Sequence, residues 1–349
     1  NYNAFWKSLQ KNLKTKESTD LSDYLVIKDM LNKDKFMFVE SDLWYDTGNV
    51  DSLQNARLQY KTLLHVLNKD DENIFIVKNK VIKFFSDENK CSNRIERAKI
   101  LNKLVPKILD SSLNFYSYNF AKGKIFSEII DNKKFVNLLR WANTNLWIPK
   151  KINYEEFKKN AIAFYKDKTN KRINIFLNNN NLKDEVNIIN KIQVPKLKTL
   201  IKKINFEKII GNNASGFHGD FISDNILIND KNKFVLIDWR EEFNNKLSYG
   251  DRNYDLAKLN HNLLFNHSLI LKNNFTIEIG KEIFLELLIK KSSLDYQKIL
   301  KQFCKVHKID FKSIEILTSL IWISMAPLHE HPLDFFLYFF GKYNLMNSL

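Results

Sequence analysis

The stretch HGDFISDNILINDKNKFVLIDW, residues 218–239, places two Asp side chains and an Asn at a spacing that suits metal-assisted chemistry. Asn225 follows Asp220 by five residues, and Asp238 follows Asn225 by thirteen. Carboxylate and amide oxygens are the ligands that a hard cation such as Mg²⁺ prefers. A further carboxylate beside such an ion can accept the proton of a substrate hydroxyl.

Two apolar runs, residues 226–228 and 234–237, are predicted to form the strands that position these side chains, with NDKNK as the turn between them. Paired strands lie about 4.8 Å apart, so a hairpin brings its two outer ends together. Asn225 enters the first strand and Asp238 leaves the second, and we therefore expect both to reach one ion. Asp220 lies in the loop that leads into the hairpin, where it can accept a proton from a hydroxyl.

This combination resembles the aminoglycoside phosphotransferase and choline kinase superfamily, whose members have a protein-kinase-like fold. The superfamily pattern H-G-D-x-x-x-x-N, then I-D-W or I-D-F, then G-D-x-x-x-D-L-A is matched here at residues 218–225, 237–239 and 250–257. The resemblance covers roughly residues 70–345. It implies an α+β, bilobal, protein-kinase-like fold with a small strand-containing N-lobe and a larger, mostly helical C-lobe. It also implies a small-molecule kinase, which transfers the γ-phosphate of ATP or another nucleoside triphosphate to a hydroxyl with the help of Mg²⁺.

The resemblance assigns a role to each matched residue. Asp220 would be the catalytic base, and Asn225 and Asp238 would bind Mg²⁺. Asp255 would brace the catalytic loop from behind, and His218 would orient that loop without doing chemistry. The alternative is a structural hairpin that is capped by polar residues and has no catalytic role.

A kinase-like site also needs a Lys on a strand that pairs with a Glu on the next helix. We expect Lys83 and Glu96 to form this pair. Lys83 lies in the β-branched and aromatic run of residues 73–85, which predicts a hairpin, and Glu96 follows on an amphipathic helix that begins at Ser92 or Asn93. Apolar residues flank Lys83 on both sides and favour it over the competing lysines, Lys80 and Lys90. Glu88 is the acid that competes with Glu96.

The run YSYNF, residues 116–120, predicts the strand at the hinge between the two lobes, where Tyr116 and Tyr118 would contact the nucleotide. An ordinary buried strand would show the same pattern. No glycine lies between Gly48 and Gly123, so the small lobe lacks a glycine-rich phosphate loop. This departure keeps a second class of function open, that of a non-catalytic, kinase-like binding module.

Recognition of the acceptor is expected from the helical lobe and from the end of the catalytic hairpin. Arg240 and Glu241 directly follow the metal-binding Asp and are candidate substrate contacts. Arg172 lies four residues after Lys168 on one face of a predicted helix, which suits a phosphate on the acceptor. Solvated surface charge is the alternative for all of them.

We rank a sugar or sugar-derivative hydroxyl first as the acceptor. Choline would need an aromatic cage for its quaternary ammonium group, to which Trp141, Trp147 and Trp322 could contribute. An aminoglycoside would favour an acidic cleft, and the net charge of +15 speaks against that. Choline kinase and aminoglycoside kinase remain the alternatives.

The segment WYDTGNVDS, residues 44–52, resembles the closing segment of sugar-phosphate nucleotidyltransferases, which end near a W-x-D-x-G element. It implies that residues 1–60 are the tail of such a domain in a longer protein, followed by an N-lobe and hinge at 61–120 and a helical C-lobe at 121–349. Nucleotidyltransferase and kinase domains are paired in pathways that make activated sugars or choline for capsule or lipopolysaccharide synthesis. An unrelated loop and helix packed on the small lobe is the alternative.

The composition indicates a folded chain of 349 residues, since 44% of its residues are hydrophobic. The positive charge alone motivates nucleic acid as a partner, but zinc-ligand spacing, an RNP-like pattern and a dense Arg patch are missing, so we expect none. Two cysteines, Cys91 and Cys304, form no disulfide framework and fit a reducing cytoplasm. No apolar run approaches the ~18 residues of a membrane-spanning helix, and no signal peptide is visible.

Overall fold

The computed structural model describes residues 2–15, 23–31, 48–49, 52, 71–266, 270 and 274–349. The chain forms two compact units, Asn1–Leu67 and Asn68–Leu349. In the first unit α1 (Tyr2–Thr15) packs against α2 (Asp23–Leu31), and the Ser8 hydroxyl contacts the Asp29 carboxylate at 2.9 Å. Most of the nucleotidyltransferase-like segment at 44–52 lies outside the described residues, so its resemblance stays a prediction.

The second unit begins with a four-stranded antiparallel sheet in the order β1-β2-β4-β3. Its strands are β1 (Glu72–Val77), β2 (Lys80–Phe85), β3 (Ile108–Ser111) and β4 (Phe115–Asn119). In β2 the buried positions alternate at Val81, Lys83 and Phe85, as expected for a strand with one face on the core. The predicted hairpin at residues 73–85 and the predicted strand at 116–120 are confirmed.

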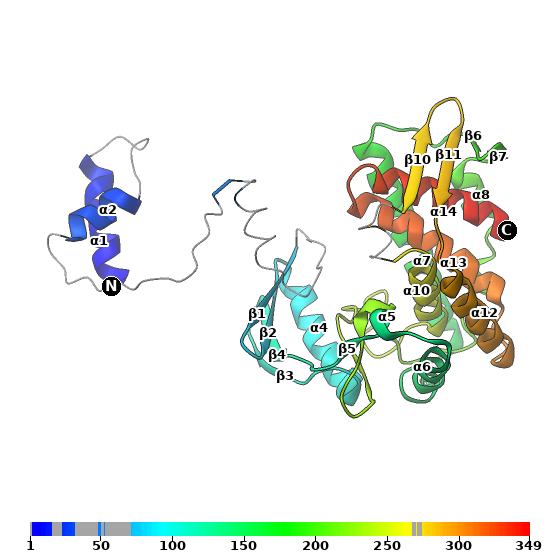
Figure 1. Ribbon diagram of the computed structural model, residues 1–349, viewed down its shortest axis with the longest axis horizontal. Helices are drawn as coiled ribbons and strands as arrows, with labels where there is room; N and C mark the ends of the chain where they lie inside the picture. The colour runs from blue at the N-terminus through cyan, green and yellow to red at the C-terminus, as the bar shows by residue number, and fades with distance from the viewer. Residues whose placement is uncertain are drawn as a thin grey trace. The chain divides into compact units, whose positions relative to one another are not determined.

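Helix α4 (Glu88–Leu101) packs against this sheet and is followed by the short 3-10 helix η2 (Asn102–Leu104). The helix begins one turn earlier than the sequence suggested. Asp87, rather than Ser92 or Asn93, is its N-cap, because the Asp87 carboxylate accepts the backbone N–H groups of the next turn. Figure 1 shows α4 beside β1–β4, next to the larger helical part of the same unit.

The C-lobe holds the predicted catalytic hairpin among helices. A three-stranded sheet joins β5 (Lys124–Ile125), β8 (Ile226–Ile228) and β9 (Phe234–Leu236), in the order β5-β8-β9, and the 3-10 helix η3 (Ser223–Asn225) leads into β8. The helices of this lobe are α5 (Phe126–Ile129), α6 (Asn132–Asn145), α7 (Tyr154–Asn179), α8 (Leu197–Lys203), α9 (Phe206–Ile209), α10 (Arg252–Leu264), α12 (Lys291–Val306), α13 (Phe311–Met325), η4 (Ala326–Leu328) and α14 (Leu333–Ser348).

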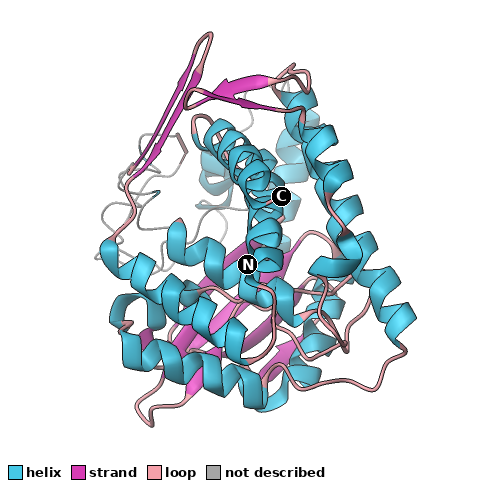
Figure 2. Cartoon of the chain, turned by 90° about the vertical axis from the view of Figure 1, so that its right-hand side faces the viewer, coloured by secondary structure: helices cyan, strands magenta, loops and turns pink. Residues whose placement is uncertain are grey.

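A second four-stranded sheet in the C-lobe was missed by the sequence analysis, which expected a mostly helical C-lobe. Its order is β10-β11-β6-β7, and it lies at the top of Figures 1 and 2. The strands are β6 (Asn187–Ile189), β7 (Ile192–Val194), β10 (Phe275–Ile279) and β11 (Ile283–Leu287). Two of them have only three residues, which is too short for a period-2 pattern to stand out from a helical one.

Helix α13 is buried on nearly all sides and packs against α14, α10 and α7. The window Phe311–Leu328 is long and apolar enough to cross a membrane by length and composition, and 72% of it is buried inside the protein. The sequence analysis expected no apolar run of this length, and the window reaches it although Lys312 and Glu315 lie within it. In this fold α13 serves as a core helix.

The predicted fold class is confirmed: a small N-lobe built on an antiparallel sheet is joined to a larger, mostly helical C-lobe. The core is continuous between the lobes. Trp239, directly after β9, is fully buried, stacks on Tyr116 of β4, and donates its indole N–H to the Arg94 carbonyl of α4 at 2.8 Å. Side chains of the two lobes are thereby held against each other beside Asp238.

Candidate active site

The β8–β9 hairpin brings Asn225 and Asp238 to the same end, as the sequence predicted. Ile226 is opposite Leu236, and the Ile237 N–H donates to the Asn225 carbonyl at 2.9 Å. The side-chain Nδ2 of Asn225 donates to Asp220 Oδ2 at 3.0 Å and to the Asp220 carbonyl at 3.0 Å. Hydrogen bonds therefore hold Asp220 and Asn225 together.

Asp255 on α10 braces the loop that carries Asp220. Its buried carboxylate accepts the backbone N–H groups of His218 and Gly219, each at 2.7 Å, and the Trp147 indole N–H at 3.0 Å. Burial raises the pKa of Asp255 to about 6, although these three hydrogen bonds favour the carboxylate. Gly219 has φ +86°, and a Cβ there would lie 2.4 Å from the Arg240 Cβ, so the loop needs glycine.

His218 is completely buried behind the same loop and does not face the reaction space. Its Nδ1 accepts the Asp220 backbone N–H at 3.3 Å. Burial lowers the pKa of His218 to about 4, so the ring is neutral at pH 7. A neutral, buried imidazole bonded to the backbone of the loop fits an orienting role.

Lys83 lies at the centre of a buried network of four charges. Its Nζ contacts Glu72 Oε1 at 3.0 Å and Asp238 Oδ1 at 2.6 Å. Arg94 of α4 contacts the same Asp238 oxygen at 2.7 Å and Glu72 Oε2 at 3.5 Å. Two carboxylates thus balance two cations at the boundary between the lobes.

The predicted pair of Lys83 with Glu96 was wrong. Glu96 is half exposed and pairs with Lys99 on the surface of α4 at 2.5 Å. Residues that are two positions apart on a helix point to nearly opposite faces. Because Arg94 points inward, Glu96 points outward. Glu72 is the acid that pairs with Lys83 instead. Lys83 is opposite Ile74 in the strand ladder, and Glu72, two residues before Ile74, points to the same face of the sheet as Ile74.

The electrostatics of this network keep both cations charged. Burial disfavours the charged form of Lys83, but Asp238, together with the smaller effects of Tyr116 and Tyr118, outweighs burial and raises the pKa of Lys83 above its ordinary value. Burial likewise opposes the charge of Arg94, and Asp238 and Glu72 together raise its pKa. Asp238 therefore meets two fixed positive charges in the absence of any ligand.

The residues for a magnesium ion are present in part. No described residue donates a hydrogen bond to the side-chain oxygen of Asn225, while its amide nitrogen is held by Asp220, so this oxygen is oriented and available. Asp238 has φ +56°, an unusual conformation for a residue other than glycine, which sets the direction of its carboxylate. Within the described ranges no group of three or more His, Cys, Asp and Glu side chains is placed to hold a metal. Phosphate oxygens of a nucleotide would have to complete the coordination, as is usual for Mg²⁺.

The two tyrosines expected at the nucleotide are core residues. Tyr116 is 1% exposed and Tyr118 4% exposed, and burial raises the pKa of both phenols. Their strand β4 is the central strand between β2 and β3, so its backbone is paired on both sides. In the predicted hinge, residues 116–120, the exposed residues are Asn119 and Phe120.

Charged side chains outside the motif also lie near Asp220 and Asp238. Lys258 of α10 contacts Asp220 Oδ1 at 2.7 Å. Glu241 lies 3.5 Å from Arg240 and 3.8 Å from Arg94. Burial disfavours the charged form of Glu241, but these two cations lower its pKa. Sequence reasoning missed three of the charged residues at the site. Glu72 and Arg94 lacked the expected spacing, whereas Lys258 directly follows the matched D-L-A element and offered a usable signal.

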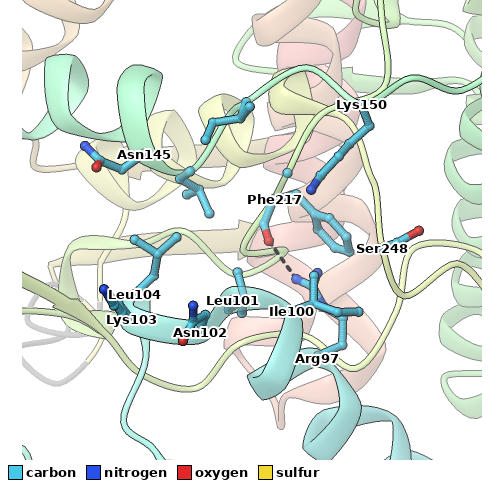
Figure 3. Close-up of a pocket in the computed structure, with 13 residues that line it drawn as sticks. Arg97, Ile100, Leu101, Asn102, Lys103, Leu104, Asn145, Lys150, Phe217 and Ser248 are labelled. Carbon is cyan, nitrogen blue, oxygen red and sulfur yellow. Dashed lines mark hydrogen bonds between the residues drawn. The ribbon is translucent and has the colours of Figure 1, made fainter.

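A cavity of about 240 Å³ lies behind the loop that carries Asp220, and its lining does not include Asp220, Asn225 or Asp238. Figure 3 shows Arg97 of α4 at this cavity, with its guanidinium group donating to the Phe217 carbonyl at 2.6 Å. Arg97 also donates to the Arg240 and Leu247 carbonyls. The cavity therefore lies beside the contacts through which Arg97 supports the loop, and not beside Asp220, Asn225 and Asp238.

Several solved structures have a similar fold. The gentamicin–APH(2")-IIa complex gives a TM-score of 0.47 at 16% identity and covers 86% of this chain and 97% of its own. Choline kinase LicA from Streptococcus pneumoniae gives 0.46 at 14% identity, covering 85% and 99%. An ethanolamine kinase from Plasmodium vivax gives 0.44 at 15%, covering 95% of both chains. No protein-family model and no curated protein matches the sequence. Similarity at this level assigns neither an activity nor a substrate to this chain.

Proposed function

We propose that this chain is a small-molecule kinase that transfers the γ-phosphate of a nucleoside triphosphate, with ATP as the first candidate, to a hydroxyl group. The observation that carries the proposal is the hydrogen-bonded pair Asp220–Asn225 at the same hairpin end as Asp238, which is in contact with Lys83. This arrangement has a proton acceptor, oxygen ligands and a fixed cation side by side. Phosphoryl transfer depends mainly on such positioning and charge stabilisation.

Each residue has a role within the proposal. Asp220, whose side chain is 30% exposed, orients the acceptor hydroxyl and takes its proton. Asn225 and Asp238 hold Mg²⁺, which neutralises charge on the phosphate oxygens when it is bound. Lys83 and Arg94 contact the phosphates of the donor when Asp238 turns to the metal ion. Two buried cations in place of one offer a way to hold phosphates without a glycine-rich loop.

The acceptor is proposed to be a sugar or sugar derivative. A choline cage of tryptophans lacks support, because Trp147 and Trp322 are each 2% exposed and Trp141 packs on Phe234. A cationic acceptor would also meet Lys258, which lies directly on Asp220. A role in making precursors of surface polysaccharide rests on the N-terminal motif at residues 44–52 alone.

The proposal is tested by thermal melting with Mg²⁺ and ATP, GTP or CTP. A ligand that binds the folded state at a hundred times its dissociation constant adds about 2.7 kcal/mol of stability. We expect one triphosphate to raise the melting temperature of the wild type only when Mg²⁺ is present, and Asp238→Asn to lose this rise. Asp230→Asn, at the exposed turn of the same hairpin, is the matched control and should keep it.

One observation favours a second candidate, a non-catalytic kinase-like binding module: Lys83 and Arg94 already occupy the Asp238 carboxylate. In that case no triphosphate raises the melting temperature at millimolar concentration, with or without Mg²⁺. A rise that does not depend on Mg²⁺ would indicate a nucleotide-binding protein whose fixed cations replace the metal.

A further inference from the structure

Four cations gather on the acceptor side of Asp220, around the hydroxyl of Tyr254. They come from three elements that are distant in the sequence. Lys168 and Arg172 belong to α7, Arg240 follows β9, and Lys258 lies one turn after Tyr254 on α10. We call Lys168, Arg172, Arg240 and Lys258 the cationic cluster.

Lys168 is fixed in this cluster by aromatic and hydroxyl contacts rather than by an acid. Its Nζ donates to the Tyr254 hydroxyl at 2.8 Å and lies 5.0 Å from the centre of the Phe164 ring. The Arg240 guanidinium lies 5.1 Å from the centre of that same ring. Two cations therefore share one aromatic ring, which positions both of them.

The acids near the cluster do not balance it. Asp220 contacts Lys258, and Glu241 is shared between Arg240 and Arg94. Within the described ranges no carboxylate lies within ion-pair distance of Lys168, and none within that distance of Arg172. Asp71 is the acid whose charge acts on Arg172, at longer range.

The gathering of like charges shifts the pKa values of the residues in this arrangement. Burial, with Arg240 and Lys258 nearby, lowers the pKa of Lys168 to about 8. Burial opposes the charged form of Tyr254 as well, but Lys168, Arg240 and Lys258 together lower its pKa. A half-buried set of like charges is unfavourable in the free protein, and a bound anion would remove the repulsion.

Asp220 separates the cluster from the metal-binding residues. Its Oδ2 accepts from Asn225, and its Oδ1 accepts from Lys258. A hydroxyl placed on Asp220 thus has Asn225 on one side and the cationic cluster on the other. The rest of the acceptor must extend toward the cluster, because the donor phosphates take the Asn225 side.

We propose that the acceptor is an anion, a small hydroxyl compound whose phosphate or carboxylate group is held by Lys168, Arg172 and Arg240 while its hydroxyl faces Asp220. This inference rests on the proposed kinase function and adds the charge class of its substrate. It separates this site from kinases that act on cationic acceptors, since a positive group would meet the uncompensated charges of Lys168 and Arg172.

Calorimetric titration of the full chain tests the proposal, with glycerol 3-phosphate, glycerate, glycerol and choline as probes. Titrations are run with and without a saturating non-hydrolysable ATP analogue and Mg²⁺. We expect glycerol 3-phosphate or glycerate to bind, and the stronger of the two names the anionic group. Glycerol and choline should not bind. Binding of choline, or of neither anion, would overturn the proposal.

Arg172→Gln and Lys168→Met locate the binding. Arg172 makes no hydrogen bond to a described residue, so its removal leaves the fold intact, and Met keeps the apolar stem of Lys168 over Phe164. Each charge-assisted contact that is lost should weaken anion binding about tenfold or more. Lys171→Gln, at an exposed neighbouring position on α7, is the control and should bind as the wild type does.

The same variants separate failure of this inference from failure of the proposed function. If they weaken binding of the ATP analogue and not of the anion, the cluster belongs to the donor and the inference is wrong. Equal anion binding in all variants would place the anion elsewhere and would also refute it. If the wild type binds the anion but no nucleotide, the kinase function fails while the anion site stands.

Discussion

Replacing Glu72 by Gln should remove the acid that holds Lys83 and Arg94 and destabilise the second unit markedly. Glu72 and Lys83 are 1% and 3% exposed, and their atoms lie 3.0 Å apart. Removing one member of a buried pair costs about 3–5 kcal/mol, because the partner charge stays buried. Both cations keep Asp238, so we expect the lower end, about 3 kcal/mol. Gln preserves the shape, so the loss reports the charge.

The assay is urea unfolding followed by the fluorescence of the tryptophans, among which Trp239 is fully buried between the lobes. Glu96→Gln is the matched control, because Glu96 is half exposed and pairs with Lys99 on the surface of α4. An exposed pair of this spacing is worth about 0.5 kcal/mol or less. A larger loss in Glu96→Gln than in Glu72→Gln would refute the reasoning and restore the strand–helix pair expected from kinases.

Four further outcomes concern the loop and the cationic cluster. Burial lowers the pKa of His218 from 6.5 to about 4, so the unfolded chain binds its proton first and the free energy of unfolding should fall by about 3 kcal/mol as pH drops from 6.5 to 4. Urea unfolding of His218→Gln should lack this loss. Burial raises the pKa of Asp255 to about 6, so the contribution of Asp255 to stability is present at low pH and is lost as pH rises from 3.8 through 6. Asp255→Asn lacks this contribution, and its free energy of unfolding should therefore fall more steeply in acid than that of the wild type. Binding of glycerol 3-phosphate should weaken as pH rises through about 8, where Lys168 loses its charge, and Lys168→Met should show no such titration. Gly219→Ala should destabilise the protein by about 1–3 kcal/mol in thermal melting, since φ is +86° and the new methyl group would meet Arg240; unchanged melting would contradict the strained loop.

Local patterns were sufficient to predict the strands that carry the site. The hairpin at residues 73–85 and the hairpin of β8 and β9 are short alternating or apolar runs with turn residues between them, and both formed as expected. Asn225 and Asp238 meet because strand pairing fixes which residues are adjacent. The three-residue strands β6 and β7 were missed, since three residues do not distinguish a strand from a helix.

The partner of Lys83 was not predictable in the same way. The sequence offers Glu72, Glu88 and Glu96 within thirteen residues of Lys83, and the choice depends on which face each acid presents to the core. The structure places Arg94 on the inner face of α4, so Glu96 points to solvent. The direction of a helix face is set by packing against the sheet, which a local pattern of mixed charges does not reveal.

The sequence by itself determined the order and spacing of Asp220, Asn225 and Asp238 and the strands that join them, because these depend on neighbours in the chain. Only the tertiary structure decided which charges surround them. Lys168 meets Tyr254 across 86 residues, and Lys83 meets Asp238 across 155. Such contacts depend on how helices and lobes pack, and electrostatic interaction depends on distance in space rather than on distance along the chain.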